Sequence, residues 1–505
     1  MLWPAGAPSD AAQVRELLVI PRDLYAAVPA VWSPDGKTVF VRVTQSLPSV
    51  KRDPKDDSPP TSNNNVSLYV SGIYEERYAR KYKDRYAKEY PEAYAESFRE
   101  LILAVDVATG RPGVLARGND IDNLYVSPDG KQLAAVQVKR HSRQQANSDD
   151  TRASPQFTRQ YWADVYLINV ADVSGLTQVD LEKLEDRKAG WTDRAGRRLD
   201  PVLTDLPFNY AGFAGGGSGT PSLSWAPDSS AFAYATVGRQ ATGDVFVFDL
   251  AARRARNLTA GVDLAASTKT LGYAEDWRFA DNSGKFGSRF APLWLPDGKA
   301  LVAVGKGDVW LIPTDEQRTP RKLTERLAQE TVRIVPSVHP GTAAADASGR
   351  LTLIAKDRDS RYDSVWKLDP ASGLLDHIVD TGLWANSDAA ILTDQRNSVL
   401  LYSGQSVESA TNIYRLSLEG NAAAPQRLTD YRLQLSERRF PESRVLSWKT
   451  ASGRAGYGLL YLPDGASTTA KVPLVVYGYP DERVSRIDER AAAGARSLTD
   501  FLDDF

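Results

Sequence analysis

The sequence contains no cysteine in its 505 residues. This absence excludes disulfides, thiol catalysis and cysteine-ligated metal sites. Histidine is nearly as scarce, because His141, His339 and His377 are the only three. No two of them stand at the spacing of metal ligands, so we expect neither a metal site nor a cofactor. The three histidines are interpreted as ordinary surface or structural side chains.

A strong charge of either sign is also missing. The formal net charge is −2, which gives no reason to expect nucleic acid or an anionic membrane as a partner. No apolar run reaches the roughly 18 residues of a membrane-spanning helix. The N-terminus lacks a basic start followed by an apolar core, so no signal peptide is expected either. The sequence therefore does not decide whether the protein is located in the cytoplasm or in the periplasm.

One turn returns along the chain. Ser33-Pro34-Asp35-Gly36 predicts a tight turn, because proline fixes φ, aspartate bonds its own backbone and glycine accepts a positive φ. The β-branched and aromatic residues 38–43 predict a strand after it. The turn and its strand recur at 126–136, 225–235 and 294–304, with weaker copies at 346–354 and 394–402.

A second short strand follows most copies, at 164–169, 244–249, 308–312, 364–369 and 412–416. Three of these strands lead to a common Leu-Thr tail that ends at Thr259, Thr324 and Thr429. A small sheet that is reused in this way predicts a mainly β fold, a β-propeller of about seven blades over residues 31–435. Chance turns in an all-β sandwich would not pair the turn and the following strand so regularly.

Two segments differ from the repeats. Residues 1–30 are predicted as an N-terminal helical segment, with a helix from Asp10 to Leu18. Residues 71–100 carry a tyrosine at every fourth position from 74 to 94 among charged residues, which predicts a helical insertion. The insertion is either a solvated helix on a blade or an arm that contacts substrate. In the second case Glu75 and Glu76 are the candidates to hold a substrate amine.

The pattern changes again after residue 435. Segments 445–450 and 457–463 predict an antiparallel pair around Ser452 and Gly453. The run 472–480 is apolar throughout, which is typical of a strand buried on both faces in an α/β sheet. Residues 488–505 have a helical pattern. An α/β domain therefore begins near residue 440, and residues 440–505 supply only its first elements.

These residues carry a resemblance to a known family. The propeller repeats, then Ser447-Trp448, Gly456-Tyr457-Gly458 and Pro473 to Pro480, resemble the propeller-to-hydrolase junction of prolyl oligopeptidase family serine peptidases. Residues 479–494 are most similar to the glutamyl-endopeptidase-like branch. The resemblance implies a propeller that gates short peptides for an α/β-hydrolase. It also implies that Tyr477, with Tyr479 as runner-up, donates its hydroxyl to the oxyanion hole.

The sequence departs from this family at the nucleophile. No Gly-x-Ser-x-Gly occurs in the 505 residues and no histidine follows His377, so the Ser/Asp/His triad is absent from this chain. We therefore expect a propeller and a truncated hydrolase segment that are inactive alone, with peptides as substrates once a catalytic domain completes them. The alternative is a stand-alone TolB-like propeller that binds a protein partner.

Overall fold

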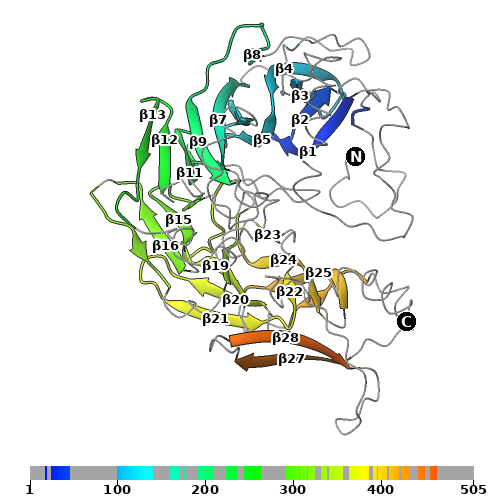
Figure 1. Cartoon of the computed structure of the whole chain (residues 1–505), viewed down its shortest axis with the longest axis vertical. Coiled ribbons are helices and arrows are strands. Elements are labelled where there is room, and N and C mark those ends of the chain that lie inside the picture. Colours follow the sequence, from blue (N-terminus) through cyan, green and yellow to red (C-terminus); the bar gives the residue numbers. More distant parts are fainter. Residues whose placement is uncertain are drawn as a thin grey trace, which may run out of the picture. The chain divides into compact units, whose positions relative to one another are not determined.

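The computed structural model describes a set of separate ranges: 17–19, 24–45, 99–139, 160–170, 176, 190–209, 223–235, 244–262, 292–305, 308–315, 317–324, 331–337, 341–356, 363–385, 391–394, 396–406, 409–419, 424–430, 442–449 and 455–462. Every regular element in these ranges is a strand (Figure 1). No described segment forms a helix that is long and apolar enough to cross a bilayer. The mainly β prediction is confirmed for this part of the chain.

The chain forms two compact units, and the first comprises Met1–Thr151 with Tyr161–Leu206. It is built on two small sheets. The first sheet, in spatial order, contains β1 (Leu24–Trp32), β2 (Thr38–Gln45), β3 (Arg99–Asp106), β4 (Pro112–Asn119) and β8 (Thr192–Asp193). The second contains β5 (Ile121–Val126), β6 (Gln132–Lys139), β7 (Gln160–Asn169) and β9 (Leu203–Asn209).

The second unit comprises Arg152–Gln160 with Pro207–Phe505 and holds four sheets of the same kind. The first of them contains β10 (Ser224–Trp225), β11 (Ala231–Ala235), β12 (Val245–Asp249) and β13 (Arg254–Asn257). The next contains β14 (Leu293–Trp294), β15 (Ala300–Gly305), β16 (Asp308–Pro313) and β17 (Arg321–Lys322). The third contains β18 (Thr331–Ile334), β19 (Leu351–Lys356), β20 (Asp363–Leu368) and β21 (Leu375–Asp380). The last contains β22 (Trp384–Ala385), β24 (Val399–Ser406), β25 (Ser409–Ser417) and β26 (Gln426–Arg427), with β23 (Ile391–Thr393) beside β24.

These six sheets are meanders of the kind that form propeller blades. In each sheet the strands follow one another in chain order, and the predicted strands of the repeats all lie within them. The described residues thus form six blade-like sheets, and the count of about seven stays a prediction.

The start of the chain differs from the prediction. Strand β1 begins at Leu24, inside the segment 1–30 that was predicted to be helical. Leu24 to Ala27 pair with Gln45 to Arg42 of β2, so the backbone of these residues is used in the first sheet. Leu17 and Leu18 are not helical and pack against the apolar side of that sheet around Val43 and Leu103. The rest of the predicted helix lies outside the described residues.

The helical insertion predicted over 71–100 also lies outside the described residues, except at its end. Arg99 and Glu100 are already part of strand β3. The first sheet therefore begins its third strand two residues earlier than predicted.

The repeated turn has the predicted geometry. Gly36, Gly130 and Gly298 have φ values of 69°, 71° and 68°, and Ser229 at the equivalent position has 63°. Each of these residues donates its N–H to the carbonyl three residues earlier at 2.9 Å. The aspartate bonds its own turn as well, because Asp35 Oδ1 accepts the N–H of Lys37 at 3.1 Å. Only glycine adopts this φ without a steric cost, which explains its recurrence in the strongest copies.

The Leu-Thr tails hold the third and fourth strands of three sheets together. Thr324 is fully buried, and its Oγ1 accepts the N–H of Val309 at 2.9 Å and donates to Asp308 Oδ1 at 3.3 Å. The same pair of contacts joins Thr259 to Val245 and Asp244, and Thr429 to Ile413 and Asn412. We call this arrangement the threonine clamp. It satisfies one backbone donor and one polar side chain in the first half of the third strand or just before it.

Removing a threonine clamp should lower the stability of the chain. Thr324→Val keeps the shape of the side chain but leaves the buried N–H of Val309 without its acceptor and removes the hydroxyl donor to Asp308 Oδ1. We expect a loss of about 2 kcal/mol in the free energy of unfolding, measured by denaturant titration. The exposed Thr319→Val is the control and should change stability by no more than about 0.5 kcal/mol. Equal effects of the two substitutions would contradict this role of the clamp.

Neighbouring sheets within each unit pack face to face through apolar side chains. In the first unit, Phe40 and Ile102 of the first sheet share one core with Leu133 and Ile168 of the second. In the second unit, shared cores join each sheet to the next in chain order, from β10–β13 to β22–β26. Each sheet buries both faces only when it is stacked, so one blade cannot fold alone.

One short segment connects three sheets of the second unit. The carbonyl of Gly341 accepts a hydrogen bond from Ser224 Oγ at 2.6 Å and from the N–H of Trp294 at 2.9 Å. Trp294 also donates its indole N–H to the carbonyl of Ser224 at 2.8 Å. Gly341 lies in the connection between β18 and β19, whereas Ser224 and Trp294 open the two preceding sheets. This segment therefore ties the first strands of adjacent sheets together.

The described part of the chain ends in a hairpin that is not a blade. Strands β27 (Glu442–Lys449) and β28 (Ala455–Leu462) pair antiparallel over their whole length. This confirms the antiparallel pair predicted around Ser452 and Gly453. The apolar run 472–480 and the rest of the predicted α/β segment lie outside the described residues.

Candidate functional site: a buried lysine network

The residues that the sequence singled out for chemistry cannot be placed. Tyr477 and Tyr479, predicted for the oxyanion hole, lie outside the described residues. Glu75 and Glu76 of the helical insertion do so as well. The described residues therefore bring none of these predicted site residues together.

Among the histidines, His377 is the one that lies in the described ranges. It stands on β21, where its Nε2 is 2.9 Å from Asp380 Oδ1 and its ring meets the edge of Trp366 at 4.8 Å. The residues that the structure describes contain no group of three or more side chains that could hold a metal ion. The side chain of His377 is 40% exposed, so this histidine lies at the surface of β21.

The most unusual polar group in the described residues lies where the repeated turn departs from its pattern. In the two weaker copies, Asp346 and Asp394 stand where the stronger copies have Ser33 and Ser127. Asp346 Oδ1 accepts the N–H of Ser348 at 2.9 Å and of Arg350 at 3.0 Å. The carboxylate thus stabilises the turn in place of the serine hydroxyl, and Gly349 keeps the positive φ at 79°.

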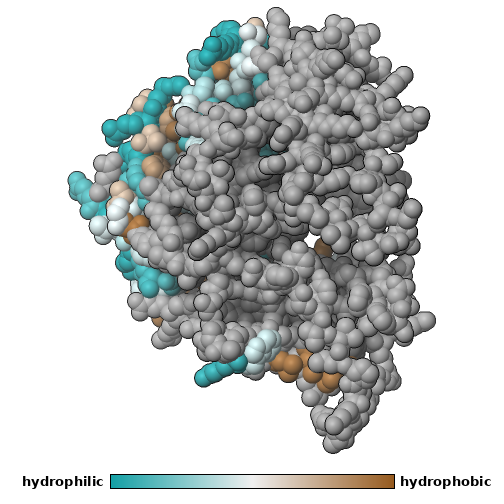
Figure 2. Space-filling view, in the orientation of Figure 1, coloured by the Kyte–Doolittle hydropathy of each residue, from teal (hydrophilic) through white to brown (hydrophobic). Residues whose placement is uncertain are grey.

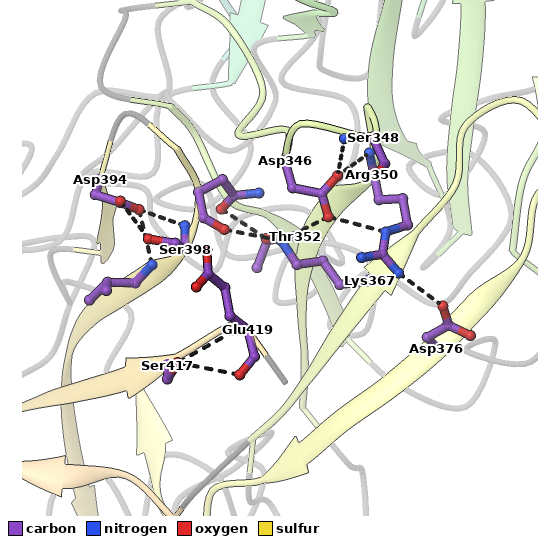
Figure 3. A network of polar contacts seen from close by, with 12 residues as sticks. Asp346, Ser348, Arg350, Thr352, Lys367, Asp376, Asp394, Ser398, Ser417 and Glu419 are labelled. Carbon is purple, nitrogen blue, oxygen red and sulfur yellow. Dashed lines mark hydrogen bonds and ion pairs between the residues drawn. The ribbon is translucent and has the colours of Figure 1, made fainter. Parts of the chain in front are cut away.

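Lys367 on β20 is buried against this turn (Figure 3). Its side chain is only 2% exposed, and its Nζ lies 3.7 Å from Asp346 Oδ2 and 3.3 Å from the carbonyl of Asn397. In three other sheets the equivalent strand position holds an apolar residue: Leu167, Val247 and Leu311. The fourth equivalent residue is Arg415 on β25. A buried lysine needs a charged partner, and Asp346 supplies it.

The network reaches solvent on one side and the next sheet on the other. Arg350 Nε is 3.1 Å from Asp346 Oδ2, and its NH1 is 3.4 Å from Asp376 Oδ2, so the arginine joins the turn to β21 (Figure 3). Toward the next sheet, Thr352 Oγ1 donates to Asn397 Oδ1 at 3.0 Å. Asn397 belongs to the turn that precedes β24 and has a φ of 51°. The network therefore links the sheet β18–β21 to the sheet β22–β26.

Burial and charge act in opposite directions on the lysine. Burial lowers the pKa of Lys367 below its ordinary value, and the Asp346 carboxylate counteracts part of this shift. For Asp346, burial alone would raise the pKa. The N–H groups of Arg350 and Ser348 and the Lys367 ammonium outweigh burial and lower it below the ordinary aspartate range. The Asp346 carboxylate is therefore charged near neutral pH and faces the Lys367 amine as its counter-charge.

The geometry limits what this network can do. The Lys367 amine is closed to solvent and so cannot attack a substrate, whereas its charge fixes the turn of one sheet against the turn of the next. Its role is to hold two adjacent blades in register. The sequence signal for it is weak: Lys367 is a cation where three of the other strands are apolar, but Arg415 is a cation at the same position, and neither residue type identifies a partner.

Comparisons with known proteins give only distant similarities. No family model matches the sequence, and no curated protein does. A puromycin-hydrolysing peptidase of Mycobacterium tuberculosis is 13% identical with a TM-score of 0.41, over 74% of this chain and 50% of the other. The β-propeller domain of the trilobed protease from Pyrococcus furiosus is 12% identical with a TM-score of 0.34, over 88% and 97%. An acylaminoacyl peptidase of Pyrococcus horikoshii is 12% identical with a TM-score of 0.39, over 86% and 50%.

The chain spans half the length of two of these structures. At such identities and TM-scores the similarities add nothing to the assignment of the fold. That assignment rests on the six meanders themselves, which stack within each unit.

Proposed function

We propose that the chain is the propeller portion of a prolyl-oligopeptidase-like serine peptidase, in which the blades gate and position short peptides. The observation that carries the proposal is the hairpin of β27 and β28. It follows the last blade-like sheet directly, and it is formed by the residues that resemble the propeller-to-hydrolase junction of that family.

Within this proposal the residues predicted from sequence have defined roles. Tyr477, with Tyr479 as the second choice, would donate its hydroxyl to the negative charge that develops on the scissile carbonyl. Residues 440–505 would form the first elements of the hydrolase domain, and the assignment to the glutamyl-endopeptidase-like branch belongs to the same proposal. Glu75 and Glu76 are the weakest part, since a charged pair on a helix is most often solvated.

The Lys367 network supports a passive role for the blades themselves. A gate made of stacked sheets works only if adjacent blades keep a fixed register. The network fixes two of them without offering a reactive group to solvent. The chemistry of peptide cleavage would then come from a catalytic domain rather than from the propeller.

The test is the intact mass and the reactivity of the protein from its native source. The present chain has a mass of 55.4 kDa, and a hydrolase domain of roughly 200–250 residues would add roughly 20–25 kDa. We expect a species near that larger mass that contains this sequence and reacts with a fluorophosphonate probe. In that protein Tyr477→Phe should slow acylation without changing the free energy of unfolding.

A native protein of the present mass that does not react with the probe would overturn the proposal. The alternative, a TolB-like propeller that binds a protein partner, would then explain the repeats. Such a protein has no need of a hairpin and an apolar run after its last blade, which is why we favour the peptidase.

A further inference from the structure

Arg333 is a basic side chain on a face where two sheets stack. The outer strands carry their basic side chains at the surface, as Arg254 does on β13, where Figure 2 shows hydrophilic surface. Arg333 instead stands on β18, directly opposite Ile354 of β19, which in turn stands opposite Val365 of β20. Residues opposite one another share a face. Because Ile354 and Val365 belong to the core shared with the sheet β22–β26, Arg333 lies on the face toward that sheet.

The guanidinium of Arg333 lacks a close partner. The side chain is half-buried, and no hydrogen bond or ion pair joins its guanidinium to any residue in the described ranges. Burial lowers the pKa of this guanidinium, and the Asp363 carboxylate acts in the opposite direction. Asp363 lies two residues before Val365 and so on the same face, where it is 3% exposed. A guanidinium offers only donors, so Arg333 needs acceptors at this position.

A second donor meets the same interface from the other sheet. Tyr402 of β24 is 2% exposed and belongs to the same core as Ile354, and its hydroxyl bonds to no described residue. Burial and the Asp363 carboxylate raise the pKa of Tyr402, so the hydroxyl stays protonated and can donate. The nearby Thr381 hydroxyl is already used, since it accepts the N–H of Leu383 at 3.1 Å and donates to the carbonyl of Asp363 at 2.7 Å.

Donors without acceptors at one interface indicate the chemistry of a ligand. A carboxylate fits them, because a planar guanidinium binds a carboxylate bidentately and a tyrosine hydroxyl can add a further hydrogen bond. A phosphate fits less well. It carries more negative charge, and the Asp363 carboxylate on the same face repels that charge more strongly.

We propose that Arg333 and the Tyr402 hydroxyl bind a carboxylate where the sheets β18–β21 and β22–β26 meet. The carboxyl terminus of a short peptide and a free organic acid share this chemistry, and the test below separates them. Part of the Arg333 side chain is exposed, so a ligand can approach it from solvent. The inference does not rest on the peptidase proposal, since a stand-alone propeller can use the same site.

Calorimetric titration of the full chain with triglycine, triglycine amide and acetate tests the proposal. We expect triglycine to bind and its amide, which lacks the carboxylate, to bind about tenfold or more weakly. Acetate that binds as tightly as triglycine would identify a free acid as the ligand, whereas weaker binding of acetate would identify a peptide. Arg333→Met and Tyr402→Phe should each weaken the binding of triglycine about tenfold or more, because each removes a hydrogen bond to a charged group.

Arg415→Met is the matched control. Arg415 is exposed on the neighbouring sheet, so its replacement should leave the affinity for triglycine unchanged. Three results would overturn the proposal: no binding of triglycine or acetate to the unmodified chain, unchanged binding to Arg333→Met, or equal binding of triglycine and its amide. Urea titration without ligand checks the fold of each variant. If Arg333 were only a counter-charge for Asp363, Arg333→Met would lower the urea midpoint and leave binding unchanged.

Discussion

Asp346→Asn should lower the free energy of unfolding by about 3 kcal/mol, because it leaves the buried Lys367 ammonium without its counter-charge. Asparagine keeps the Oδ1 acceptor for the N–H groups of Ser348 and Arg350, so the turn itself is retained. The loss should therefore report the contacts of the charged Oδ2 atom with Lys367 and Arg350. Denaturant titration at neutral pH measures it.

The matched control is Asp380→Asn. Asp380 lies in the same sheet and also contacts a basic side chain, that of His377, but the Asp380 side chain is 81% exposed. Its replacement should change stability by no more than about 0.5 kcal/mol. The double variant Asp346→Asn with Lys367→Met should recover most of the loss, since an apolar side chain of similar size removes the uncompensated charge. A double variant no more stable than Asp346→Asn would show that charge is not the cause.

The same variant should depend on pH in a defined direction. Burial lowers the pKa of Lys367 in the folded chain, and removing the Asp346 carboxylate lowers it further. Between that lowered pKa and the ordinary lysine value, the unfolded chain binds more protons than the folded one. The free energy of unfolding of Asp346→Asn should therefore rise with pH across this interval. A flat profile from neutral to alkaline pH would contradict the assignment.

Gly341→Ala should also cost about 3 kcal/mol, for a steric reason. Gly341 has a φ of 84°, and a Cβ there would lie 2.9 Å from the backbone nitrogen of Trp225 and 3.1 Å from its carbonyl oxygen. The backbone of Trp225 cannot turn aside as a flexible side chain could. The variant should weaken the tie between the sheets that begin with Ser224 and Trp294, as measured by thermal and denaturant unfolding.

Gly349→Ala separates the cost of a positive φ from the cost of the steric clash with Trp225. Gly349 has a similar φ of 79°, but a Cβ there meets no atom within 4 Å. This control should therefore show only the cost of the backbone conformation, about 1 kcal/mol. If both substitutions had the same effect, the close approach of Gly341 to Trp225 would not matter to stability.

The sequence by itself determined the repeating unit. The turn of Pro34, Asp35 and Gly36 is local chemistry, since proline, aspartate and glycine each fix one feature of the backbone within four residues. For this reason the turns, the strands after them and the hairpin around Ser452 and Gly453 were all predicted in place. The helical segment predicted over 1–30 was a local inference too. Local patterns did not show that residues 24–27 pair with β2.

Only the tertiary structure showed how neighbouring blades are joined. Lys367 and Asp346 are twenty-one residues apart in the sequence, and Ser224 and Gly341 are 117 apart, so no local pattern relates either pair. The repeated Leu-Thr tail was visible in the sequence. That its threonine accepts a backbone N–H, as Thr324 does from Val309, could be learned only from the structure. Contacts of this kind depend on which surfaces meet when the sheets stack. In the sequence such residues appear only as departures from the repeat. Their contact partners follow from the packing of the sheets.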